Sequence, residues 1–232
     1  MQSTIVQLNN KEHQNIKLTP NHDFTHVASH HVTPVLMQEL GRVAADLPVA
    51  FIKNSETGDY LCVALLGLKE GENLLVKDGQ WQGTFIPAGY THYPLALVPY
   101  PEDAKKYVIT IDMASNAVSD NGDALFNEDG TESEYLQKRR QALETYYKCA
   151  IATREFTKTL VALELLEEKG FTIEVGEDKR KVTGIHVVNE EKFNALPDDK
   201  IVELHKKGYL GAVYAHMISL SQTPRLVNRL KA

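Results

Sequence analysis

Residues 47–99 read LPVAFIKNSETGDYLCVALLGLKEGENLLVKDGQWQGTFIPAGYTHYPLALVP, and this stretch decides the fold. Apolar and β-branched runs alternate here with turn signals at 54–58, 70–73 and 78–79, which is typical of antiparallel strands joined by short turns. The continuous apolar run at 62–66 predicts a central strand that is covered on both faces. We expect strands at 49–53, 60–68, 74–76, 84–86, 95–98 and 107–113.

Helical patterns dominate the rest of the chain. Thr33 and Pro34 suit a helix start, because Thr accepts backbone N–H bonds at an N-cap and Pro fits the first turn, so a short helix is expected at 34–45. Residues 132–169 contain neither Pro nor Gly and carry apolar residues at helical spacing. This predicts one long helix or two abutting ones, ended by Gly170. A strand pair at 171–175 and 182–188, a charged turn at 176–181 between them, and a helix from Asp198 to about residue 207 should follow.

The acidic segment 120–134 holds six carboxylates and no Lys or Arg, which indicates an exposed connector. The sequence therefore predicts an α+β protein. Its N-terminal half is expected to form an antiparallel, strongly curved sheet or partial barrel, and its C-terminal half to be mostly helical. The expected division is 1–118 for the β-rich half and 132–232 for the helical half. The two should pack as one compact unit, because the apolar face of 132–169 is too broad to stand in water.

Composition excludes several classes of function. The formal net charge is -6 and the pI is near 5.9, which disfavours nucleic-acid binding because counterion release needs a basic face. No apolar run approaches the roughly 18 to 20 residues that cross a bilayer, so no transmembrane segment is expected. The N-terminal residues lack the pattern of a signal peptide, and the two cysteines, Cys62 and Cys149, fit buried apolar positions. A cytoplasmic protein is the expectation.

Short sequence motifs within residues 48–94 and near the C-terminus carry a family resemblance. They are Pro48-Val49-x-Phe51, Leu66-Gly67-Leu68, Glu72-Asn73-Leu74, Asp78-Gly79-x-Trp81, Phe85-Ile86-Pro87-Ala88 and Tyr93-Pro94, with Tyr214-Ala215-His216 and Ser219-Leu220 near the C-terminus. The chain resembles the SapC family, which is named for a link to bacterial surface-layer proteins. The resemblance implies an accessory protein and specifies no reaction. The family more often has an arginine pair before Tyr-Pro, where this chain has Thr91 and His92, so an anion-binding role for that position is weakened.

The leading hypothesis is a binding protein for a peptide or protein partner connected with the bacterial cell surface. Aromatic residues on loops can bind peptide faces, although they equally pack at the edge of a core. A histidine in an apolar helix can line a pocket or serve as a hydrogen-bonded core residue. The predicted contact residues are Trp81, Tyr90, His92, Tyr93 and His216.

The alternative hypothesis is a metal-dependent enzyme that uses a histidine cluster. His22, His26 and His30 recur every four residues, and imidazole is a common metal ligand, although solvated histidines are also common in polar segments. The sequence has no GxxxxGK[ST], GxGxxG, HExxH or CxxC motif, so no cofactor is expected. A third interpretation is a subunit of a larger assembly. The sequence leaves the enzyme question and the oligomeric state open.

Overall fold

The computed structural model describes residues 4–20, 22–100, 103–175 and 178–230. The chain divides into two compact units, each built from two segments that are distant in sequence. The first unit contains Met1–Asp23 and Ala88–Lys148, and the second contains Phe24–Pro87 and Cys149–Ala232. The predicted halves, 1–118 and 132–232, are each continuous in sequence, so their boundaries differ from those of the two units. That these halves are structural parts of the chain stays a prediction.

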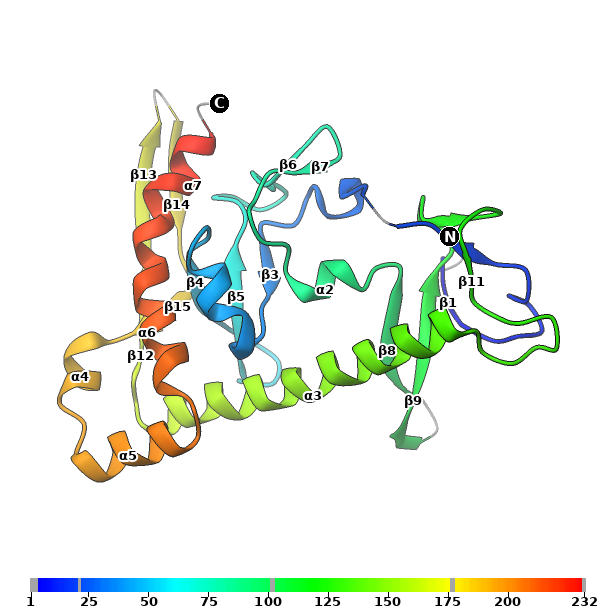
Figure 1. Cartoon of the computed structure of the whole chain (residues 1–232). Coiled ribbons are helices and arrows are strands. Elements are labelled where there is room, and N and C mark those ends of the chain that lie inside the picture. The colour runs from blue at the N-terminus through cyan, green and yellow to red at the C-terminus, as the bar shows by residue number, and fades with distance from the viewer. Residues whose placement is uncertain (1–3, 21, 101–102, 176–177, 231–232) are drawn as a thin grey trace. The chain divides into compact units, whose positions relative to one another are not determined.

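The first unit contains two small antiparallel sheets and the N-terminal part of a long helix (Figure 1). One sheet has the order β1-β9-β8 and the other β10-β2-β11. The elements are β1 (Ile5–Gln7), β2 (Lys17–Leu18), α2 (Ala88–Thr91), β8 (Leu95–Tyr100), β9 (Asp103–Asp112), β10 (Val118–Ser119), β11 (Asp123–Ala124) and α3 (Glu134–Ala162).

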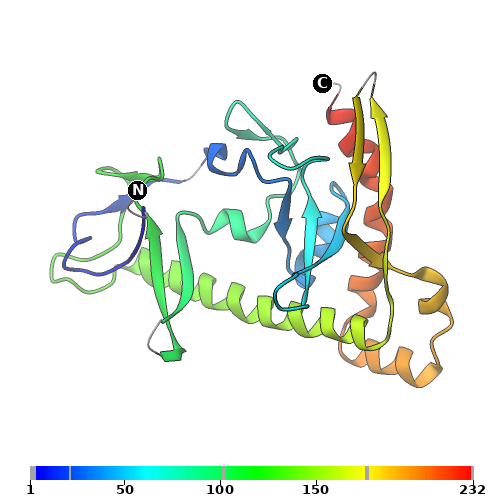
Figure 2. The ribbon, with the colours of Figure 1, turned by 180° about the vertical axis from the view of Figure 1, so that it is seen from behind.

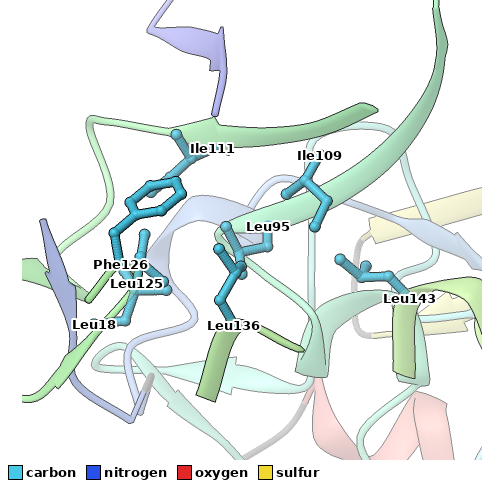
Figure 3. Packing of buried hydrophobic residues seen from close by; sticks show 8 residues of the cluster. All are labelled: Leu18, Leu95, Ile109, Ile111, Leu125, Phe126, Leu136 and Leu143. Atoms are coloured by element: carbon cyan, nitrogen blue, oxygen red, sulfur yellow. The ribbon is translucent and has the colours of Figure 1, made fainter. Parts of the chain in front are cut away.

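Apolar side chains from β2, β8, β9, α3 and the segment after β11 form the core of the first unit (Figure 3). Ile109 and Ile111 are two residues apart in β9 and therefore point to the same face of the sheet. Leu136 and Leu143 are seven residues apart, two helical turns, and lie on the face of α3 that covers this sheet. The members are Leu18, Leu95, Ile109, Ile111, Leu125, Phe126, Leu136 and Leu143.

The second unit is built on a five-stranded antiparallel sheet of order β12-β15-β4-β5-β3 (Figure 2). Two separate hairpins, β6-β7 and β13-β14, accompany it. The strands are β3 (Val32–Pro34), β4 (Val49–Lys53), β5 (Tyr60–Leu65), β6 (Val76–Lys77), β7 (Gln80–Trp81), β12 (Leu166–Glu168), β13 (Phe171–Val175), β14 (Asp178–Val182) and β15 (Ile185–Val188). The helices are η1 (Thr25–Val27), η2 (Met37–Glu39), α1 (Leu40–Val43), α4 (Glu190–Asn194), α5 (Asp198–Lys206), α6 (Leu210–Ser219), η3 (Leu220–Gln222) and α7 (Thr223–Arg229).

The α+β class and the helix-rich C-terminal half are confirmed, and the sheets are not closed into a barrel. The strand at 49–53 has the predicted bounds as β4. Residues Cys62 to Leu66 are all buried, and β5 lies between β4 and β3. The apolar run therefore predicted a covered inner strand correctly.

The helix predicted at 34–45 was wrong at its start. Thr33 and Pro34 belong to β3, where Thr33 is opposite Ala64, and regular α-helix is confined to α1. Pairing with β5 therefore overrides the local capping signal. The strand predicted at 84–86 is not found, because the described residues 84–86 form no regular secondary structure.

Two further boundaries differ near residue 165. The long helix ends at Ala162, well before Gly170, and Glu164 adopts a positive φ of 54° that turns the chain into β12. The predicted pair of strands was also wrong in its partners, because β13 pairs with β14, while β15 joins β12 and β4. Residues 176–177 of the predicted turn lie outside the described part of the chain.

Candidate ligand-binding groove

A groove of about 530 Å³ lies in the second unit. Its walls come from β3, from the ends of β4 and β5, from the loop 67–70 that follows β5, and from residues 181–185. The groove therefore crosses the five-stranded sheet and is bounded by the turn that leads from β14 into β15. Its volume lies within the range of roughly 300 to 1,000 Å³ that is typical of ligand sites.

The floor of the groove is apolar, because strand register places four of its lining side chains, and the neighbouring Leu61, on one face of the sheet. Val32 is opposite Leu65, and Ile185 is opposite Ile52. Ile52 is also opposite Leu61, which precedes Leu65 by four residues, so all five side chains share this face. Leu61 is 48% exposed and extends the apolar surface beyond the groove.

The opposite face of this sheet is covered by helices. Phe51, the neighbour of Ile52, points to that face, and its ring lies 6.3 Å from the ring of Phe156 in α3 and 5.0 Å from that of His216 in α6. The alternation of side chains along β4 thus separates a helix-covered core from the groove.

The loop that forms one wall of the groove is fixed by a close backbone approach and by an ion pair. A Cβ atom at Gly67 would collide with the carbonyl oxygen of Glu72, so this position requires glycine. The carboxylate of Glu72 accepts a hydrogen bond from the Leu68 N–H at 3.1 Å and binds Arg180 of β14. These contacts join the loop to the β13-β14 hairpin.

Trp81 lies beside the groove's loop in sequence but is held by its own hairpin. Asp78 and Gly79 have φ angles of 50° and 75°, which is the conformation of a two-residue hairpin turn between β6 and β7. The indole Nε1–H of Trp81 donates to the Phe85 carbonyl at 2.9 Å, and its ring lies 5.7 Å from that of Phe24.

His216 is a core residue of the second unit. Its Nε2 accepts a hydrogen bond from the Val188 N–H at 3.0 Å, so the neutral ring carries its proton on Nδ1. Burial lowers the pKa of His216 to about 4. The Ser219 hydroxyl accepts a hydrogen bond from the Val49 N–H and donates one to the His216 carbonyl. It therefore links the backbone of β4 to that of α6.

Tyr90, His92 and Tyr93 lie together in the first unit, in and directly after α2. The guanidinium of Arg139 donates to the His92 carbonyl at 2.7 Å, and the His92 ring lies 5.2 Å from that of Tyr146. Burial, followed by the nearby Arg139 charge, lowers the pKa of His92 to about 4. The Tyr93 hydroxyl donates to Asp112 at 3.0 Å, and burial raises its pKa.

The structure therefore brings three of the five predicted contact residues together, Tyr90, His92 and Tyr93, and places Trp81 and His216 on separate elements of the second unit. None of the five is among the residues that line the described groove. Sequence analysis missed this groove. Ile52, Leu61 and Leu65 lie on one face of the sheet, but this becomes apparent only once the register of β4 and β5 is known.

The geometry gives no support to the histidine metal site. Among the residues that the structure describes, no group of three His, Cys, Asp or Glu side chains could hold a metal ion. The spacing of His22, His26 and His30 would align them on one face of a helix or of a strand, but residues 22–30 contain only the three-residue η1. The metal hypothesis therefore rests on sequence spacing alone.

No helix in the described part of the chain has both the length and the apolar character to cross a bilayer. No curated protein matches the chain, and no solved structure does. The family model described as SapC matches residues 8–226 of the 232 residues. This match spans both compact units and includes the strands, turns and helices described above. The chain therefore belongs to the SapC family.

Proposed function

We propose that the protein is an accessory protein that binds a short segment of a peptide or protein partner in the groove of the second unit. The observation that carries this proposal is the apolar floor formed by Val32, Ile52, Leu65 and Ile185 on the sheet face opposite the helices. Val32 and Ile52 are partly exposed in this floor, while Leu65 and Ile185 are buried. Partly exposed apolar surface in a concavity often marks an interaction site. A concave floor with separate side-chain positions fits the side chains of a bound segment.

Membership of the SapC family supports a partner connected with the bacterial cell surface. The two cysteines support a reducing compartment such as the cytoplasm, because Cys62 is buried and both thiols are free. The binding event that we propose therefore occurs inside the cell, on a segment of a protein that later serves the surface. A second prediction, separate from this groove, is that the partner contacts Trp81, Tyr90, His92, Tyr93 and His216.

Selection from a displayed library of random peptides, with the full chain immobilised, tests the proposal. Thr183 lines the groove and is exposed, so Thr183→Trp fills the groove without disturbing a buried position. Thr172→Trp places the same side chain at an exposed position of β13 that does not line the groove. Selected peptides should bind Thr183→Trp at least about tenfold more weakly than the wild type, measured by fluorescence anisotropy.

Two results would overturn the proposal. One is a library from which no peptide is enriched on the full chain. The other is a set of enriched peptides that bind Thr183→Trp and Thr172→Trp with the affinity of the wild type, since binding would then occur away from the groove. Circular dichroism of both variants establishes that each is folded before binding is compared.

A further inference from the structure

Three lysines line the groove, and one carboxylate does. Lys69 and Glu70 belong to the loop after β5, Lys53 ends β4, and Lys181 lies near the end of β14. All four residues are exposed. The formal charge of this lining is positive, whereas the chain as a whole carries a formal charge of -6. Positive charge is thus concentrated around an apolar floor in an otherwise acidic protein.

These lysines are also unpaired within the described part of the chain, where none of the three lies within ion-pair distance of a carboxylate. Lys53 Nζ lies 5.8 Å from the centre of the Tyr60 ring. Neighbouring cations behave differently, because Lys179 pairs with Glu174 and Arg180 with Glu72. Within the described residues, the three lysines around the groove therefore have no carboxylate at ion-pair distance.

We propose that the groove selects an acidic segment, in which Asp or Glu residues flank apolar side chains. This inference rests on the proposed function and specifies its ligand. The apolar side chains contact the floor formed by Val32, Ile52, Leu65 and Ile185, while the carboxylates meet the lysines at the mouth. Lysine has a flexible four-carbon stem, so an exposed ammonium group can follow a carboxylate on the bound segment.

The distribution of the lysines favours several carboxylates over one phosphate. They come from three separate elements, which spreads positive charge along the groove. The guanidinium of Arg180 donates through Nη1 to both oxygens of Glu72, so its charge is already paired with a carboxylate. Solvent-exposed pairs of this kind each change affinity by about threefold, and salt weakens them.

Three displayed libraries test this inference on the immobilised full chain. Each has four randomised apolar positions at its centre and differs only in the flanks, which are Asp and Glu, Asn and Gln, or Lys. We expect the acidic library to be retained best, and its retention to fall about tenfold between 50 mM and 500 mM NaCl. The double variant Lys69→Gln/Lys181→Gln should lose about tenfold in affinity for the selected acidic peptides.

A matched control removes the same charge elsewhere in the second unit. Lys158→Gln/Lys200→Gln changes an exposed and a half-buried lysine that do not line the groove and that pair with nearby glutamates. If both double variants lose affinity equally, net charge and not the groove attracts the acidic peptides, and the inference is wrong.

Other outcomes separate the two proposals. If acidic and neutral libraries are retained equally and Thr183→Trp abolishes retention of both, the groove binds peptides without charge selection. The inference then fails and the proposed function stands. If the lysine-flanked library is retained best, the inference is wrong in sign. If no library is retained, the proposed function fails together with it.

Discussion

The Nη1 atom of Arg180 lies 2.7 and 2.8 Å from the two carboxylate oxygens of Glu72. The pair is largely shielded, with 13% of the Arg180 side chain and 15% of the Glu72 side chain exposed. It joins β14 to the loop that follows β5, and both segments line the groove. One ion pair therefore fixes the spacing of two groove walls.

A double-mutant cycle on Glu72→Ala and Arg180→Ala should give a coupling free energy of at least about 1 kcal/mol, because the pair is shielded from water. The cycle is needed because Arg180 has interactions besides this one. Urea denaturation of the four proteins measures the free energies of unfolding. The exposed pair Glu174 and Lys179 is the control, with an expected coupling below about 1 kcal/mol. Equal coupling in the two cycles would show that shielding adds nothing.

Gly67→Ala should destabilise the second unit by about 1–3 kcal/mol, because the new Cβ would collide with the Glu72 carbonyl and force the loop to move. Gly211→Ala is the matched control in α6, where a Cβ would meet nothing within 4 Å. That change should stabilise the protein by a few tenths to about 1 kcal/mol, as alanine is the better helix former. Thermal denaturation of both variants measures the difference. A Gly67→Ala protein as stable as the wild type would contradict the close approach.

Burial of His216 predicts a loss of stability in acid. Its pKa is lowered from 6.5 to about 4 in the folded state. Above pH 6.5 the ring is neutral in both states, and between pH 6.5 and 4 the unfolded chain binds a proton that the folded chain does not. Stability should therefore fall over this window by up to about 3 kcal/mol from this residue, and the contribution becomes constant below it.

His216→Gln tests the window, because glutamine offers an acceptor to the Val188 N–H but does not titrate. The free energy of unfolding of the variant should fall less than that of the wild type between pH 6.5 and 4. His205→Gln, an exposed position of α5, is the control and should follow the wild type. Parallel pH profiles for wild type and His216→Gln would refute a buried neutral ring.

Local sequence patterns correctly predicted strands whose apolar residues are buried in the folded protein. The strand at 49–53 and the covered run at 62–66 were predicted correctly because continuous apolar runs need burial wherever they lie. Thr33 and Pro34 were misassigned because their strand is created by pairing with Ala64 and Val63 of β5, a long-range contact that no local signal carries.

The groove was beyond sequence analysis for the same reason. Ile52 and Ile185 are separated by more than a hundred residues, and only strand register places them opposite each other. The division into units is likewise long-range, since each unit combines segments on either side of the other in the chain. Trp81, one of the predicted aromatic contact residues, instead stabilises its own loop, because its indole N–H donates a hydrogen bond to the Phe85 carbonyl.

Asp46 should be the most sensitive carboxylate in the second unit. Its side chain is fully shielded, its Oδ2 accepts from the Thr84 N–H at 2.7 Å, and its Oδ1 lies 3.4 Å from Arg229 and 3.7 Å from Arg225. Asp46→Asn keeps the size but removes the charge that these arginines meet, so a loss of about 1–3 kcal/mol is expected. Arg229→Gln should cost more than Arg225→Gln, because 22% of the Arg229 side chain is exposed against 51% of Arg225.

Trp81 provides the measurement, since it is the only tryptophan in the chain. A Cβ atom at Gly83 would lie 2.6 Å from the Trp81 Nε1 and 2.8 Å from the Asp46 Oδ2, so the indole and the carboxylate border the same glycine. Loosening the segment around Asp46 should therefore shift Trp81 emission to longer wavelength in the folded variant and lower its urea midpoint. Glu203→Gln on the exposed face of α5 is the control for losing a paired carboxylate. If Asp46→Asn matches this control in both emission and midpoint, the arginines stabilise α7 independently of Asp46.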